Sequence, residues 1–420
     1  MTREPLDGPR RWTPPPFAAG PAAVDWEARA DPAALRDARL ARVRELLRGS
    51  DSDALLVWKD ENVRYLTGLR AQILTGKSSI LNGCLLFEDS PPVLLCSGGE
   101  LARARAQMPW IDDVRQIPIQ EADGLIAGTV QLTLLPLLRE HGIVDGRLAI
   151  DQVPLSLLMN LRRLAPDLEL DDGDALMLAA RRLKFPEEIA FMEEASAIAE
   201  AVTQTALDAV APGVREWDVV GEAMRTLYRL GGEMPHVATP FVASGERMSP
   251  PTRFATDKLI RDGDIVFIDI GAMWNGYYSD MARATVCGRP SRRQQEIYTA
   301  VYDSLQAGTA AMKAGNTNDD VADAVRSAAT QHGGLEAHFL SLFIGHGVGI
   351  GTNEPPYVGE ALAGAETAVL EPGMTFALEP LIWVPDVPGG GGVRLEDTIV
   401  VGLDGGRALT RTQFDERLLL

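Results

Sequence analysis

The sequence predicts an α/β (α+β) protein of two domains, the second of which is built as an internal duplication. Three observations support this fold class. The chain has 420 residues, more than a single hydrophobic core usually organises. In its first part, short apolar runs alternate with helical segments, as they do in a sheet covered by helices. In its second part, two pairs of helices are each followed by a strand hairpin.

The composition limits the kinds of partner. Hydrophobic residues make up 46% and charged residues 24% of the chain, as in ordinary globular proteins. A net charge of −19 argues against nucleic acid as a partner. Three cysteines without a Cys-x-x-Cys pair fit a reducing compartment. Because no apolar run approaches the ~20 residues of a membrane span and no secretory signal begins the chain, we expect a cytoplasmic protein with no membrane partner.

Changes in composition and in secondary-structure pattern along the chain predict three parts. Residues 1–30 are rich in Pro, Arg and Asp and predict an irregular arm. Residues 31–178 predict an α/β domain that begins with a helix near Pro32–Arg48. Residues 179–420 predict a second domain that holds any catalytic constellation.

The duplication inside this second domain is weak but ordered. Helices near Glu216–Leu230 and Asn318–Gln331 both follow a glycine turn, begin with acidic residues and end at Gly-Gly. Each belongs to a helix pair that precedes a strand hairpin. The repeat occurs only twice, so it predicts two facing halves rather than a solenoid.

The first hairpin covers Asp264–Val286. A β-rich run on each side of Asn275-Gly276 predicts two strands joined by a tight turn. Asp269 and Asp280 then face each other across it, which is unfavourable unless a cation lies between them. The alternative is that both aspartates are solvated edge residues.

The second hairpin repeats this arrangement. Met374–Trp383 and Val393–Val401 predict its two strands, and Glu379 and Glu396 lie about symmetrically around the loop between them. Between the hairpins in sequence, His346 is flanked by glycines that let the backbone approach whatever it binds.

Two carboxylate pairs and one imidazole predict a site for two divalent cations. Four carboxylates carry the negative charge that two such ions neutralise, and bridging carboxylates hold two ions ~3.5–4 Å apart. Oxygen-rich ligation favours Mn, Fe, Co or Mg over a thiolate zinc site. Glu379 is then the candidate to shuttle a proton from a metal-activated water.

These residues stand in motifs that resemble those of the pita-bread metallohydrolases, the family of aminopeptidase P, prolidase, methionine aminopeptidase and creatinase. The motifs are FIDIG, YYSD, GHGVG, LEP and RLEDT. The resemblance implies five metal ligands: Asp269, Asp280, His346, Glu379 and Glu396. It further implies a creatinase-type N-terminal domain, a pita-bread catalytic domain, a homodimer, and a metal-activated hydroxide that attacks the peptide bond to proline. The metal remains open among Mn, Fe, Co and Zn.

The chain departs from the family's peptidases at two positions. Thr252 and Asn353 stand where those peptidases have the histidines that bind substrate and stabilise the oxyanion. Neither side chain carries a proton at neutral pH. His236 is a candidate to compensate, the alternative being a loop histidine without a role, and Tyr357 is a further candidate substrate residue. Arg394 fits the prolidase-like GGVRLED pattern and is a candidate catalytic residue with Glu379 and His346.

Other features resemble the pita-bread dimethylsulfoniopropionate lyase. The stretch Ala243–Pro250 matches its ASG-x-R-x-x-P pattern, and Leu409–Asp415 matches its LT…FD tail. Thr352, however, stands where that lyase has an aspartate. The leading hypothesis is a two-metal hydrolase of a short peptide or small amide. The alternatives are a C–S lyase and a non-catalytic binding protein.

Overall fold

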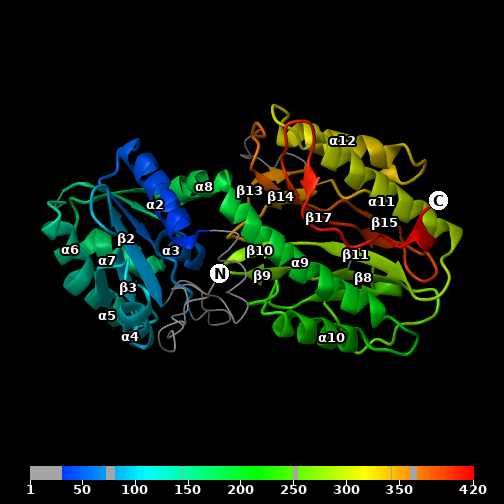
Figure 1. Ribbon diagram of the computed structural model, residues 1–420, viewed down its shortest axis with the longest axis horizontal. Helices are drawn as coiled ribbons and strands as arrows, with labels where there is room; N and C mark the ends of the chain where they lie inside the picture. The colour runs from blue at the N-terminus through cyan, green and yellow to red at the C-terminus, as the bar shows by residue number, and fades with distance from the viewer. Residues whose placement is uncertain (1–30, 72–80, 144, 249–253, 342, 360–366) are drawn as a thin grey trace, which may run out of the picture. The chain divides into compact units, whose positions relative to one another are not determined.

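The computed structural model describes residues 31–71, 81–143, 145–248, 254–341, 343–359 and 367–420. Within these ranges the chain divides into two compact units (Figure 1). Of the described residues, the first comprises Asp51–Asp171, and the second combines residues 31–50 with Asp172–Leu420. Among the described helices, none is both long and apolar enough to cross a bilayer. The predicted boundary between residues 178 and 179 stays a prediction.

The first unit is a mixed six-stranded sheet with the strand order β4-β3-β2-β1-β5-β6. β1 pairs antiparallel with β2 and parallel with β5. The strands are β1 (Ala54–Val57), β2 (Asn82–Phe87), β3 (Val93–Cys96), β4 (Asp113–Gln116), β5 (Arg147–Ile150) and β6 (Glu169–Asp172). The helical segments are α3 (Asp60–Thr67), α4 (Gly98–Gln107), α5 (Asp123–Thr129), the π-helical turn η1 (Val130–Leu134), α6 (Leu135–Glu140) and α7 (Leu155–Leu164).

The two ends of the first unit lie close together. Ser52, near its beginning, donates a hydrogen bond of 3.4 Å to Asp171 at its end. Arg147 pairs both with Asp51 and with Glu169, at 3.5 and 2.7 Å. The chain therefore leaves this unit near the point where it entered.

Helix α2 (Pro32–Arg48) has the predicted bounds and belongs to the second unit, although it precedes the first unit in sequence. Asp31 caps it by accepting two backbone hydrogen bonds. Its buried Arg39 donates to the hydroxyl of Tyr277, which in turn donates to Glu188 of α9. This buried contact fastens α2 to the first hairpin.

The first half of the second unit places two helices against two small sheets. Helix α9 packs on β9 and β10, and α10 packs on α9 and β7 (Figure 1). The three-stranded sheet has the order β11-β8-β7, and β9 pairs with β10. The elements are α8 (Gly173–Arg182), α9 (Pro186–Asp208), α10 (Glu216–Arg229), β7 (Phe241–Ser244), the 3₁₀ turn η2 (Gly245–Arg247), β8 (Ile265–Asp269), β9 (Ala272–Trp274), β10 (Tyr277–Ser279) and β11 (Ala282–Val286).

The second half repeats this plan. Helices α11 and α12 pack on each other, α11 also on β14–β16 and α12 on β13. The larger sheet has the order β13-β12-β14-β17-β18, and β15 pairs with β16. The elements are α11 (Arg292–Ala311), α12 (Asn318–Thr330), η3 (Glu336–His338), β12 (Gly345–Gly347), β13 (Glu354–Val358), β14 (Thr375–Leu378), β15 (Leu381–Trp383), β16 (Gly392–Arg394), β17 (Asp397–Val400), β18 (Arg407–Ala408) and η4 (Glu416–Leu418).

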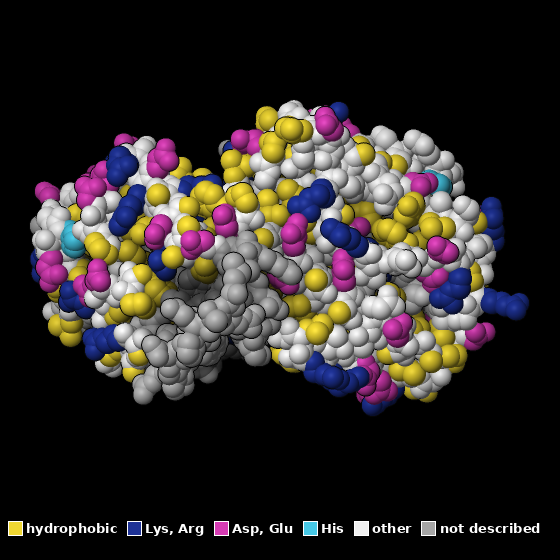
Figure 2. Space-filling model, viewed as in Figure 1, with side chains coloured by type: hydrophobic (Ala, Val, Ile, Leu, Met, Phe, Trp, Pro, Cys, Tyr) yellow, Lys and Arg dark blue, Asp and Glu magenta, His cyan; other side chains and the backbone are white. Residues whose placement is uncertain are grey.

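Acidic and basic side chains are interspersed over the described surface on the face that Figure 2 shows. The three cysteines, Cys84, Cys96 and Cys287, are buried free thiols. Burial is the main reason that the pKa of the Cys96 thiol is raised to about 11. This thiol is therefore protonated at neutral pH and a poor nucleophile.

Candidate metal centre

The first hairpin is interrupted where its aspartates stand. Instead of the two continuous strands expected, β8 pairs with β11 and β9 pairs with β10. Asp269 ends β8, and Asp280 lies between β10 and β11. The chain is tight here, because a Cβ on Gly271 would lie 2.1 Å from the carbonyl oxygen of Ser279. The break turns both buried carboxylates inward.

The second hairpin is interrupted in the same way. The strands expected over Met374–Trp383 and Val393–Val401 are each divided in two. Glu379 lies between β14 and β15, and Glu396 lies between β16 and β17. Both side chains are buried. A regular ladder would alternate its side chains between faces, so the breaks are what let both carboxylates face the same interior.

Backbone contacts join the two hairpins at their carboxylates. Ala282 and Glu396 exchange backbone hydrogen bonds of 3.3 and 3.0 Å. The hydroxyl of Thr398 accepts from the Asp280 N–H at 2.9 Å and donates to the Asp280 carbonyl at 2.8 Å. Asp280 and Glu396, from different halves, are thereby held side by side.

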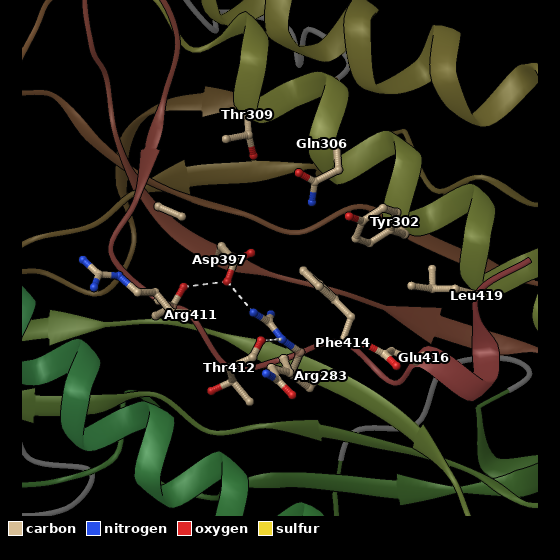
Figure 3. Close-up of a pocket in the computed structure, with 13 residues that line it drawn as sticks. Arg283, Tyr302, Gln306, Thr309, Asp397, Arg411, Thr412, Phe414, Glu416 and Leu419 are labelled. Carbon is tan, nitrogen blue, oxygen red and sulfur yellow. Dashed lines mark hydrogen bonds and ion pairs between the residues drawn. The ribbon is translucent and has the colours of Figure 1, made fainter.

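A buried arginine, Arg283, supports this junction, and Figure 3 shows its contact with Asp397. Arg283 donates to the carbonyl of Glu396 at 2.7 Å and to the carboxylate of Asp397 at 2.7 Å. It also lies over the ring of Phe414. A cavity of 440 Å³ next to Arg283 is lined by the C-terminal segment and α11, and it contains none of the four inward carboxylates.

His346 reaches the carboxylates from β12, an inner strand of the five-stranded sheet. Its flanking glycines allow close packing, since a Cβ on Gly345 would lie 2.5 Å from the carbonyl oxygen of Ala377. The Nε2 atom of His346 lies 3.4 Å from Glu379 Oε1 and 3.7 Å from Asp280 Oδ2. Its Nδ1 atom contacts the carbonyl oxygen of Gly347 at 3.0 Å.

His236 lies on the opposite side of the first pair. Its Nε2 atom is 3.2 Å from both Asp269 Oδ1 and Asp280 Oδ1. Its Nδ1 atom accepts a hydrogen bond of 2.7 Å from the Gly271 N–H. The residue precedes β7 in an irregular segment, so strand periodicity in the sequence gave no sign of this position.

Arg394 connects the two carboxylate pairs. Its Nη1 atom lies 3.1 Å from Asp269 Oδ2 and 2.9 Å from Glu379 Oε2. Although burial opposes it, the charges of Glu379 and Asp269 raise the pKa of this guanidinium above its usual value. The side chain is therefore a permanent cation inside the site.

Burial and mutual repulsion set the protonation of the carboxylates. Burial, opposed by His236 and assisted by Asp269, raises the pKa of Asp280 to about 6. Burial, followed by the charges of Asp280 and Glu379, raises the pKa of Glu396 well above its ordinary value. Burial also acts to raise the pKa of Asp269, but the contacts with His236 and Arg394 outweigh burial and lower this pKa below its usual value.

Burial likewise acts to lower the pKa of His236, but the neighbouring carboxylates outweigh it and raise the pKa to about 9. The hydrogen bond from Gly271 acts in the opposite sense, because an N–H donor requires a lone pair on Nδ1.

The donor set fits divalent metal ions. Three buried oxygens lack a well-aligned hydrogen bond: Asp269 Oδ1, Asp280 Oδ1 and Glu396 Oε2. Among the described residues, Arg394 is the one guanidinium that pairs with these carboxylates. Buried charge of this kind requires a cation.

Two groups of potential ligand atoms each lie within 4.8 Å of one another. The first comprises His236, Asp269 and Asp280, and the second comprises Asp280, His346 and Glu396. Asp280 belongs to both, as a carboxylate that bridges two ions would. Glu379 belongs to neither group and is held by Arg394.

Comparison with known proteins identifies the family. Residues 190–402 match the model of metallopeptidase family M24, and residues 39–183 match the creatinase/prolidase N-terminal domain. The chain belongs to the M24 metallopeptidase family. The uncharacterized peptidase YqhT of Bacillus subtilis is 31% identical over 378 residues, which cover 89% of this chain and 98% of that protein.

Further relatives of this M24 metallopeptidase have named activities. The Xaa-Pro dipeptidase of Pyrococcus horikoshii is 28% identical over 375 residues, covering 89% of this chain and 97% of that protein. The structure of the Xaa-Pro dipeptidase from Bacillus anthracis superposes with a TM-score of 0.76 at 26% identity, covering 90% and 99% of the two chains. The predicted family, the fold class and a metallohydrolase are confirmed, whereas these relatives give no support to the lyase or the binding protein.

The candidate substrate residues of this metallopeptidase do not cluster in the structure as the carboxylates do. Thr252 lies outside the described residues. Asn353 is exposed, and Tyr357 is 42% exposed. The ring of Tyr357 lies 6.1 Å from that of Phe343, which stacks on His346 at 5.5 Å. Tyr357 is thus linked to the centre through one intervening ring.

One supporting residue escaped the sequence analysis. Buried Glu354 accepts a hydrogen bond of 3.0 Å from the Gly351 N–H and pairs with Arg181 at 3.2 Å. It thereby fixes the segment that carries Asn353. The signal was present as an acidic residue directly after Asn353, but nothing in the sequence pairs it with Arg181, which is distant along the chain.

Proposed function

We propose that this M24 metallopeptidase hydrolyses the bond between an amino acid and proline, or a closely related small amide, with two divalent ions. The observation that carries the proposal is the convergence of four buried carboxylates and His346 in a chain whose relatives include Xaa-Pro dipeptidases along nearly their whole length. The ions would be held by five side chains: Asp269, Asp280, His346, Glu379 and Glu396.

Such ions supply Lewis acidity and make a nearby water more acidic. The chain's own residues do the rest. Glu379 is the proton carrier, since its Oε1 faces His346 and its Oε2 is held by Arg394. Arg394 also contacts Asp269, so it orients one carboxylate from each hairpin. Burial of the set excludes bulk water and strengthens these electrostatic contacts.

The substrate residues are proposed to be Thr252, Asn353 and Tyr357, whereas His236 faces the carboxylates of Asp269 and Asp280. Asn353 donates hydrogen bonds to a substrate carbonyl without moving a proton. Tyr357 offers a partly exposed ring beside Phe343, suited to a small apolar side chain or a proline ring. This set favours a short substrate whose polar groups are recognised by neutral donors.

Three finer properties are part of the proposal. Oxygen-rich ligation with nitrogen supports Mn or Fe, with Co or Zn as replacements in vitro. A homodimer follows from the family resemblance, and a cytoplasmic location follows from buried free cysteines. Metal analysis of freshly purified protein and its mass in solution test the first two directly.

The decisive experiment is a reconstitution series. Metal-stripped protein is reloaded with Mn, Fe, Co or Zn and offered Xaa-Pro dipeptides, longer X-Pro peptides, small amides and dimethylsulfoniopropionate. We expect metal-dependent release of proline or of the residue before it, and loss of that activity in Glu379→Gln. Release of dimethyl sulfide without peptide hydrolysis would contradict the proposal, as would metal binding without turnover of any substrate.

A further inference from the structure

Two histidines face the inward carboxylates and share Asp280, and their rings are held by backbone groups of opposite kind. His346 Nδ1 lies 3.0 Å from a carbonyl oxygen, that of Gly347. His236 Nδ1 lies 2.7 Å from an amide nitrogen, that of Gly271. A carbonyl only accepts and an amide N–H only donates, so each partner dictates where the ring carries its hydrogen.

His346 has the hydrogen arrangement of a metal ligand. Because the Gly347 carbonyl requires a donor, Nδ1 carries the hydrogen and Nε2 keeps its lone pair. That lone pair points toward Glu379 and Asp280, at 3.4 and 3.7 Å. Metal-bound histidines are commonly held this way, with the second ring nitrogen donating to a carbonyl or carboxylate.

His236 has the reverse arrangement. Because the Gly271 N–H requires an acceptor, Nδ1 keeps its lone pair, and in the neutral ring the hydrogen is on Nε2. This atom lies at the same distance, 3.2 Å, from Asp269 Oδ1 and Asp280 Oδ1. Neither oxygen has a hydrogen bond of regular geometry, so the Nε2–H is divided between the two oxygens and leaves lone pairs on both for a cation.

The backbone that holds His236 has little room to change. A Cβ on Gly271 would meet the Ser279 carbonyl oxygen at 2.1 Å and His236 Nδ1 at 3.0 Å. The ring of His236 also packs edge-on against Phe241 at 6.3 Å between centroids, and its side chain is 6% exposed. The packing therefore maintains the hydrogen bond that selects the hydrogen arrangement.

We propose that His236 is a positioning residue of the metal centre and not a sixth metal ligand. Its Nε2–H is shared between Asp269 and Asp280 and holds the two carboxylates together, while their remaining lone pairs and oxygens stay available to a cation. Proximity alone would make His236 a ligand, because its Nε2 belongs to a group of potential ligand atoms. The hydrogen on that nitrogen removes the lone pair that ligation needs.

The first test reads the ring hydrogens directly in the unmodified protein. With ¹⁵N-labelled histidine, the five histidines give few enough signals to assign by substituting His141, His332 and His338. In metal-free protein at pH 10, above the pKa of about 9 of His236, His236 is expected to carry its one hydrogen on Nε2, and His346 on Nδ1. After loading with diamagnetic Zn²⁺, Nε2 of His346 shifts to the range of a coordinated nitrogen and that of His236 does not. A coordinated Nε2 at His236 would overturn the proposal.

The second test uses an amide that donates as the imidazole does. In His236→Gln the side-chain NH₂ replaces the Nε2–H, whereas His236→Ala removes it. We expect Ala to weaken metal binding by ~10–100-fold, the usual loss when a residue that orients ligands is removed, and Gln to restore most of it. The visible spectrum of the Co²⁺ protein should be unchanged in His236→Gln and altered in His346→Gln. A changed spectrum in His236→Gln would mean that a nitrogen ligand was lost.

This inference rests on the proposed metal centre, and the two fail differently. If the unmodified protein binds no metal stoichiometrically, the proposed function is contradicted, although the metal-free ring states of both histidines can still be compared. If metal binds and His236 coordinates it, the proposed function stands and only the positioning role is contradicted.

Discussion

The two halves of the catalytic unit both contain an interrupted hairpin, but they differ in the turn that joins its strands and in the segment that supplies a histidine. In each half a hairpin is interrupted where an acidic side chain must turn inward. The first half joins its strands by a two-residue turn, with positive φ at Asn275 and Gly276, and receives its histidine from an irregular segment. The second half has a longer connection and receives His346 from an inner strand, β12.

This difference shows how one residue type acquires two roles. His346 and His236 both lie within 4 Å of inward carboxylates. A carbonyl behind the first leaves a free lone pair, and an amide N–H behind the second leaves a bound hydrogen. The role is decided by the backbone group on the far side of the ring, so duplicated halves need not be functionally symmetric.

The largest expected effect comes from removing a carboxylate of the second half. Glu379→Gln keeps the shape of the side chain but removes its charge and its capacity to carry a proton. We expect kcat on the best Xaa-Pro substrate to fall by ~10²–10⁴-fold, the range of general acid–base catalysis. Steady-state kinetics at saturating metal measure it. Glu222→Gln, on the exposed surface of α10, should leave kcat unchanged. If kcat fell as much in Glu222→Gln as in Glu379→Gln, the loss could not be assigned to proton transfer by Glu379.

A smaller effect is expected from separating the halves at their junction. Thr398→Val removes the hydroxyl that holds both backbone groups of Asp280 and leaves them buried without that partner. We expect about 1–3 kcal/mol of lost unfolding free energy, measured by urea denaturation of metal-free protein. Thr398→Ser retains the hydroxyl and serves as the control. Equal stability of the Val and Ser variants would show that the contact does not join the halves.

The pH dependence of metal binding should reflect the raised pKa values of Asp280 and Glu396. Asp280, whose pKa is raised to about 6, and Glu396, whose pKa is raised well above its usual value, bind protons in the metal-free site as the pH falls. A metal must displace them, so affinity is lost as pH falls through 6 and gained as pH rises. We expect up to about a tenfold change per pH unit for each proton displaced, measured by competition with a chromophoric chelator. An affinity independent of pH between 5 and 7 would contradict this assignment.

The smallest expected effect is a gain at the substrate side. Asn353→His places an imidazole where the family's peptidases have one, on an exposed residue. We expect kcat on Xaa-Pro dipeptides to rise between about twofold and tenfold, below the ~10²-fold that a well-placed acid–base group contributes. Asn353→Gln, which keeps an amide, is the control. An unchanged or lower kcat would indicate that the substrate is oriented differently from that of the related dipeptidases.

Much of the centre was accessible from sequence because its signals are local. The Asn275-Gly276 turn and the similar spacing around it predicted that Asp269 and Asp280 meet, and the structure brings them to a shared distance from His236. The interruption of each hairpin was not predicted. The alternation of apolar and polar side chains predicts that a strand is present. It does not predict where the strand is interrupted, because a break depends on contacts such as that of Gly271 with Ser279.

Partners distant in sequence were the second limit. Thr398 stands in an ordinary strand pattern, and its role arises only because it lies against Asp280, 118 residues away. The ring state of His236 depends on a backbone amide, which every residue except proline possesses. Sequence therefore identified which side chains carry the chemistry, while the hydrogen bonds that assign their roles required the fold.

The place of α2 in the chain has a consequence for the order of folding. Arg39 is synthesised 238 residues before the Tyr277 that it contacts, so this helix emerges from the ribosome long before its packing surface exists. The first unit, which begins and ends at adjacent points, can fold completely in the interval. By closing on itself it returns the growing chain to α2, so that a segment of more than a hundred residues acts, for the catalytic unit, as a short loop.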